Sequence, residues 1–108
     1  MTDCSGVDFD GVRYTFYERR LARIEADQTV RPGLTLLGGL TIGQDFDEAV
    51  RFVEVRAGVR LVRTKAHDGR DVAGSAFVLR ARTGTAYSIE LVAGKDGRLA
   101  SVVQRVDF

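Results

Sequence analysis

Residues 76–106 constrain the fold most, because apolar and polar side chains alternate there on both sides of two glycine-containing turns. A turn of odd length at residues 83–85 would set three apolar residues of one strand opposite three of the next: Phe77, Leu79 and Ala81 facing Leu91, Ile89 and Tyr87. A turn of even parity at residues 94–97 would add Ala100, Val102 and Val106 to this face. Since strand side chains alternate with period two, this register gives a uniformly apolar face. The segment therefore predicts a double β-hairpin that packs one face on a core.

The opposite face of the double hairpin is mixed, with apolar side chains at its centre and arginines around them. This composition is typical of protein interfaces. The sequence offers no second helix of useful length to cover this face. We therefore predict a surface that binds another protein, or a second copy of the chain as a homodimer, made of Val78, Arg80, Arg82, Val92, Leu99, Val103 and Arg105.

Residues 45–57 carry the signals of an amphipathic helix. Asp45 is a favourable N-cap, and Glu48 completes an Asp-x-x-Glu capping box. Gly58 stands where a left-handed C-cap would end the helix. Apolar residues recur at helical spacing and predict one buried stripe: Phe46, Ala49, Val50, Val53 and Ala57.

Three further segments have the alternation or β-branched content of strands. Val12–Tyr17 and residues 21–26 predict a hairpin around Glu18, Arg19 and Arg20, and residues 59–63 predict a strand with Val59 and Leu61 inward. Residues 65–71 predict a polar loop that turns at Asp68-Gly69, and residues 1–11 predict a loosely ordered start.

These elements predict one α+β domain over residues 1–108. Its antiparallel sheet would have five to six strands, with one helix (about 45–57) packed on one face. A length of 108 residues suits one hydrophobic core.

Composition excludes several classes of function. A net charge of +1 gives no electrostatic basis for binding nucleic acid. No apolar run approaches the roughly 20 residues that span a bilayer, so we expect no membrane span. The chain as written is expected to be cytoplasmic, or periplasmic or secreted if a leader has been removed. Cys4 alone cannot form an internal disulfide.

Residues with chemical potential are few and scattered. His67 with Asp68 and Asp71 could orient a general base or hold a metal ion, but no nucleophile accompanies them and three ligands make a thin set. We expect an exposed turn histidine, no catalytic residue, no metal and no cofactor. The alternative is a small-molecule or catalytic pocket between helix and sheet, with Tyr14, Tyr87 and His67 as its polar groups.

A resemblance supports the binding interpretation. Arg20, Leu21 and Ile24 close a hairpin, and the run Gly39-Leu40-Thr41-Ile42-Gly43 then enters the acidic-capped helix. This arrangement resembles small bacterial α+β domains, namely the outer-membrane assembly lipoproteins of the BamE/SmpA type and the repeat unit of β-lactamase inhibitor protein. The resemblance covers about residues 38–106. The chain departs from these families in having one helix, no cysteine pair and no lipidation signal. The resemblance implies a non-enzymatic binding or inhibitory module and transfers no site residue.

Overall fold

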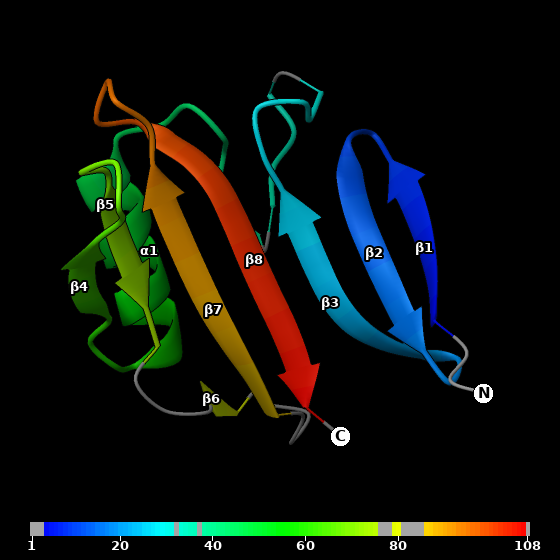
Figure 1. Cartoon of the computed structure of the whole chain (residues 1–108). Coiled ribbons are helices and arrows are strands. Elements are labelled where there is room, and N and C mark those ends of the chain that lie inside the picture. Colours follow the sequence, from blue (N-terminus) through cyan, green and yellow to red (C-terminus); the bar gives the residue numbers. More distant parts are fainter. Residues whose placement is uncertain (1–3, 32, 37, 76–78, 81–85, 108) are drawn as a thin grey trace.

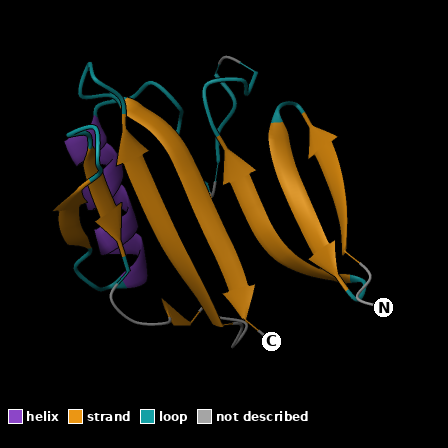
Figure 2. Cartoon of the chain, in the orientation of Figure 1, coloured by secondary structure: helices purple, strands orange, loops and turns teal. Residues whose placement is uncertain are grey.

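One antiparallel sheet crosses the whole molecule, and a helix packs against one of its faces (Figures 1 and 2). The computed structural model describes residues 4–31, 33–36, 38–75, 79–80 and 86–107. Along the chain the elements are β1 (Cys4–Phe9), β2 (Val12–Tyr17), β3 (Arg20–Ala26), α1 (Phe46–Ala57), β4 (Val62–Lys65), β5 (Asp71–Gly74), β6 (Leu79–Arg80), β7 (Ala86–Ala93) and β8 (Leu99–Asp107).

The strands follow the spatial order β1-β2-β3-β8-β7-β5-β4, and the short β6 pairs with β7. The predicted α+β class, with an antiparallel sheet and one helix, is confirmed. The sheet path has seven strands rather than five to six. The N-terminal hairpins extend the sheet beyond β8, because β3 pairs with β8 from Arg23 opposite Arg105 to Ala26 opposite Val102.

Two parts of the chain account for the difference in strand number. The sequence predicts no strand in residues 1–11, yet β1 forms there and pairs with β2 along its whole length. The strand predicted at residues 59–63 begins instead at Val62, and its hairpin with β5 was not foreseen. Leu61 precedes the strand because it is tied to the helix: its backbone N–H donates to Glu54 Oε2 (2.8 Å), and its side chain is buried in the core.

The predicted helix is confirmed at both ends. Asp45 Oδ2 accepts the Glu48 backbone N–H at 3.1 Å, and Gly58 adopts a left-handed conformation (φ 70°) while its N–H bonds to the Glu54 carbonyl. The predicted stripe turns toward the sheet: Phe46, Ala49, Val50 and Val53 are buried, and Ala57 is half-buried.

The register of the double hairpin differs in detail from the prediction. Leu79 pairs with Tyr87 rather than with Ile89, a displacement of two residues that keeps the parity. In the second hairpin, Gly94 N–H bonds to the Arg98 carbonyl at 2.7 Å, so the loop between them is odd. A bulge then restores the parity, because Ala93 pairs with Leu99 while Val92 pairs with Ser101. Ala100, predicted for the core face, is the unpaired residue of that bulge.

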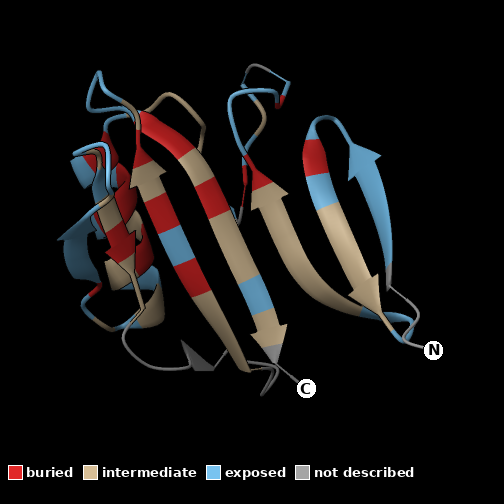
Figure 3. Ribbon diagram, in the orientation of Figure 1, coloured by how far each residue is buried: buried red, intermediate tan, exposed pale blue. Residues whose placement is uncertain are grey.

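The core lies between α1 and the half of the sheet formed by β8, β7 and β5 (Figure 3). We call this covered side the inner face and the opposite side the outer face. Inner-face residues Ala73, Leu91 and Val102 are buried and join the helix stripe in one cluster. Toward the N-terminal hairpins, Val30, Leu36 and Leu40 from the segment before the helix belong to the same cluster. Strand β1 remains exposed (Figure 3).

Candidate protein-binding surface

The outer face carries three rows of side chains across the middle of the sheet. Directly paired residues of an antiparallel sheet point to the same side, so the pairings define the rows. One row contains Val72, Val92 and Ser101, the next Glu90, Val103 and Glu25, and the third Ser88, Arg105 and Arg23. We call these nine residues the outer strip.

The outer strip combines half-buried valines with exposed charges. Val72, Val92 and Val103 are half-buried, and Glu90 and Arg105 are exposed. Arg23 Nη2 lies 2.5 Å from Glu25 Oε1, an ion pair at the surface of the sheet. Its contribution to stability is small because water screens it. The strip therefore has valines toward one end and charges of both signs toward the other, with Val103 flanked by Glu90 and Glu25.

The predicted binding residues reach this surface only in part. Val92, Val103 and Arg105 lie on the outer strip. The backbone of Arg80 pairs with Ala86, but the side chain of Arg80 lies outside the described part of the chain. Val78 and Arg82 also lie outside the described residues.

Leu99 is a correction to the predicted surface. Its side chain is 1% exposed and belongs to the core cluster. Two backbone hydrogen bonds with the segment before the helix fix it there: Leu99 N–H donates to the Gln44 carbonyl, and Gly43 N–H donates to the Leu99 carbonyl, both at 2.8 Å. The bulge beside Leu99 turns its side chain inward, against the alternation that the sequence suggested.

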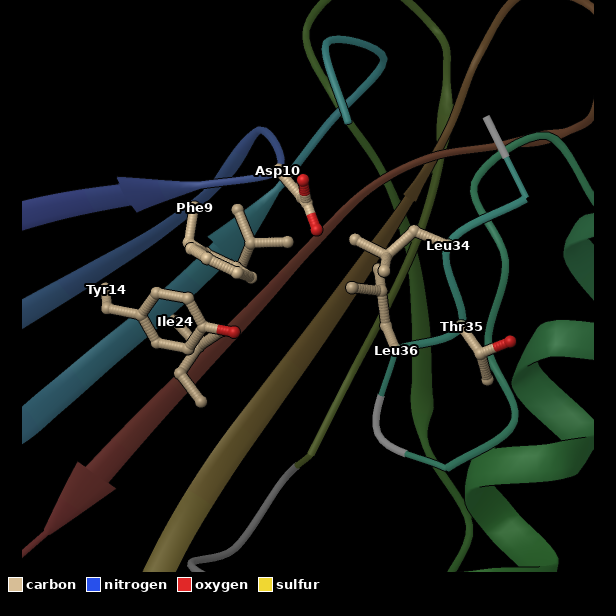
Figure 4. Close-up of a pocket in the computed structure, with 8 residues that line it drawn as sticks. Phe9, Asp10, Tyr14, Ile24, Leu34, Thr35 and Leu36 are labelled. Atoms are coloured by element: carbon tan, nitrogen blue, oxygen red, sulfur yellow. The ribbon is translucent and has the colours of Figure 1, made fainter. Parts of the chain in front are cut away.

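An apolar hollow of about 200 Å³ opens on the inner face of the N-terminal hairpins. Figure 4 shows Phe9, Tyr14 and Ile24 on the strand side, facing Leu34 and Leu36 on the segment that leads to the helix. Among the lining residues, Asp10 carries a carboxylate. Its Oδ2 atom lies 3.8 Å from Arg31 Nη2. The hollow is therefore lined mainly by apolar side chains and has few polar groups that could bind or react with a ligand.

The three polar groups suggested for a catalytic pocket do not come together. Tyr14 lines the hollow, Tyr87 packs half-buried against the core, and His67 lies in the β4–β5 turn. Strands β2 and β4 lie toward opposite edges of the sheet, which separates Tyr14 from His67. The hollow that contains Tyr14 lies between the N-terminal strands and the segment that leads to the helix.

The acidic residues near His67 are already engaged in the turn. Asp68 Oδ2 lies 2.7 Å from Arg70 Nε, and Lys65 Nζ lies 2.6 Å from Asp71 Oδ1. The hydrogen bonds from Arg70 lower the pKa of Asp68 below its ordinary value. Across the described ranges, no group of three or more histidine, cysteine, aspartate or glutamate side chains is arranged to hold a metal ion.

The sequence analysis missed the exposed apolar residues of β1. Val7 is 53% exposed and Phe9 is 67% exposed. They pair with Tyr14 and Val12, so they lie on the inner face beside the hollow. The signal was present: Asp10-Gly11 is a strong hairpin turn, and a strand after it implies a strand before it.

No family model, curated protein or solved structure matches this chain. The resemblance to the BamE/SmpA and β-lactamase-inhibitor domains therefore stays a prediction. Within the described residues, no helix has the length and apolar character needed to cross a bilayer.

Proposed function

We propose that this chain is a non-enzymatic protein-binding module, of an inhibitory, immunity or envelope-associated kind, and that the outer strip is its binding surface. The observation that carries the proposal is the set of half-buried valines (Val72, Val92, Val103) over which no described element packs. In a module of this kind the helix side supplies stability, and the other side of the sheet is available to a partner.

The composition of the outer strip supports a protein as the partner. Apolar residues that adjoin a charged border, as the valines of the strip do, are typical of protein interfaces. Arg105 is exposed in the row next to Val103, and arginine is enriched among the residues that contribute most to binding energy. We place the contact with the partner around Val92, Val103 and Arg105.

The character of the hollow argues against the small-molecule alternative. Its volume of about 200 Å³ is below the roughly 300–1,000 Å³ typical of ligand pockets. Its lining holds Tyr14 and Asp10 but no cluster of convergent ionisable groups. Catalysis generally requires such a cluster. A second hollow, of about 390 Å³, has the volume of a ligand pocket, but two of its charged lining groups, Asp68 and Arg70, already pair with each other at 2.7 Å. We therefore favour binding of a protein through the sheet.

The test is a comparison of matched glutamate substitutions in a reconstituted complex. Candidate partners captured with the wild-type chain would be purified and titrated by calorimetry against wild type, V103E and V55E. Val55 is a 76% exposed valine on α1 and serves as the control. We expect V103E to weaken binding by at least about tenfold and V55E to leave it unchanged. A partner that binds V103E as tightly as wild type would refute the outer strip as the binding surface.

A further inference from the structure

Strand β1 forms an edge of the sheet, and its inner face carries exposed apolar side chains. Among the strands that the structure describes, only β2 pairs with it. Edge strands are commonly protected against pairing with another chain by lysine, proline or a bulge. The six residues of β1 contain neither lysine nor proline, and the pairing with β2 runs without a shift in register. The edge is therefore open to a further strand.

The backbone groups on this free edge follow from the β1–β2 turn. Asp10 and Gly11 have φ values of 53° and 84°, as in the type I′ turn of a two-residue hairpin. Such a turn is flanked by a hydrogen-bonded pair, here Phe9 and Val12. Hydrogen-bonded and non-hydrogen-bonded pairs alternate, so Gly6 and Asp8 direct their N–H and C=O groups away from β2.

A pair of opposite charges borders the same edge. Arg13 extends over Gly6: a Cβ added at Gly6 would lie 3.2 Å from Arg13 Nη2. Asp8 lies directly opposite Arg13 in the β1–β2 pairing, yet no ion pair of either residue occurs among the described side chains. The free edge thus presents a guanidinium above Gly6 and a carboxylate at Asp8, two residues apart.

We propose that a second copy of this chain occupies the free edge, with the two β1 strands antiparallel across a two-fold axis and Val7 opposite Val7. In this register each Gly6 lies opposite the other copy's Asp8, and both residues direct their backbone groups toward the partner strand. The Asp8 carboxylate then meets the guanidinium that covers the second copy's Gly6. Two symmetry-related ion pairs result. On the inner face the same register brings the two Val7 side chains together and covers part of each Phe9.

The neighbouring two-fold registers are unfavourable for charge reasons. A shift by one residue in each strand toward the C-terminus sets Asp8 opposite Asp8. The shift in the other direction sets Gly6 opposite Gly6 and brings the two Arg13 guanidinium groups together. Like charges directly opposite one another destabilise a strand pair. The charge pattern of β1 and β2 therefore fits a second copy in one register. An unrelated strand would gain only the backbone hydrogen bonds.

The inference is independent of the outer strip, because the joined strands extend the sheet and leave its outer face open. The test uses sedimentation equilibrium of the whole chain over a range of concentrations, in reducing buffer so that Cys4 cannot crosslink two copies. Wild type is expected to show a concentration-dependent dimer. D8R and R13D are each expected to raise the dissociation constant by at least about tenfold, since like charges replace both ion pairs.

Mixing the two variants decides the question. In a mixed pair, the arginine introduced by D8R in one chain faces the aspartate introduced by R13D in the other. The native Asp8 of the second chain likewise faces the native Arg13 of the first, so equimolar D8R and R13D should recover the wild-type association. An effect of either substitution on folding within one chain would not be rescued by mixing. Circular dichroism of each variant checks the fold.

Three results would overturn the inference. One is a wild-type chain that stays monomeric at the highest concentration. Another is a mixture of D8R and R13D that stays monomeric although wild type dimerises. The third is a dimer that V92E dissociates and D8R leaves intact, which would assign self-association to the outer strip instead.

Discussion

At the scale of single residues, the β2–β3 turn holds two side chains in an unfavourable backbone conformation. Glu18 and Arg19 have φ values of 48° and 66°, and neither is glycine. The left-handed region costs an L-residue roughly 1–2 kcal/mol. A glycine at either position would remove this steric cost. Glycine also loses more conformational entropy on folding, so only part of the cost would appear as added stability.

We therefore expect R19G to raise the free energy of unfolding by about 0.5–1 kcal/mol. The measurement is urea denaturation, in which the midpoint should rise at constant slope. R19A retains the Cβ and is the control, so it should not stabilise. Equal midpoints for R19G and R19A would show that the side chain, not the backbone conformation, sets the cost.

Asp27 offers a residue-scale prediction on pH. Thr29 donates both its backbone N–H (2.9 Å) and its hydroxyl (2.6 Å) to Asp27 Oδ1. Both hydrogen bonds favour the ionised carboxylate and lower the pKa of Asp27 from its ordinary 3.8, and the bond from the hydroxyl has the larger effect. A folded-state pKa below the unfolded one means that the stabilisation is present above about pH 3.8 and is lost as the pH falls through the folded value.

Substituting Thr29 should reveal this effect. T29V removes the hydroxyl donor and should raise the pKa of Asp27 toward its ordinary value, whereas T29S retains the donor and should leave the pKa low. An NMR titration of the Asp27 carboxyl carbon measures both. A T29V titration that overlays wild type would rule out the hydroxyl as the main cause.

At the scale of elements, α1 depends on its N-cap and on close contact with the loop before it. Asp45 accepts the Glu48 N–H, and removing such a cap typically costs about 1 kcal/mol. We expect D45A to lower the free energy of unfolding by this amount and D45N, which keeps the acceptor, to remain close to wild type. Denaturant melts of the two variants test the cap, and an equal loss in both would assign the effect to charge.

The loop–helix contact is tight at Gly39. A Cβ added there would lie 2.3 Å from the Phe52 ring, and Arg56 in turn lies 5.8 Å above that ring. We expect G39A to destabilise the chain by about 1–3 kcal/mol, as overpacking usually does. Gly74 is the matched control, because a Cβ at Gly74 would meet its neighbours at ordinary contact distance, 3.7 Å or more. Thermal melts compare the two, and equal losses would mean that the loop can move away from Phe52.

At the scale of the whole molecule, the sheet is longer than its helix can cover. The buried cluster links α1 to β5, β7 and β8, whereas residues 5–9 of β1 are exposed (Figure 3). Local opening requires least energy where few apolar contacts are lost. We expect amide hydrogen exchange at low concentration to be fastest in β1 among the long strands and slowest in β7 and β8. Mass-spectrometric exchange measures this, and protection of β1 equal to that of β8 would contradict it.

The sequence by itself determined the features that depend on near neighbours in the chain. Asp45 and Gly58 marked the helix ends because capping involves residues within one turn. The alternation in β7 placed its core face correctly, since strand parity is also a local property. These signals sufficed for the α+β class and for Val92, Val103 and Arg105 on the outer face.

Tertiary structure decided what depends on distant segments. Leu99 points inward because residues 43 and 44, far away in the chain, bond to its backbone. The partnership of β3 with β8 and the position of β1 at the edge depend on which strands meet in space, and alternation carries no information on this. The same holds for Arg13 above Gly6, a contact that exists only once β1 and β2 have paired.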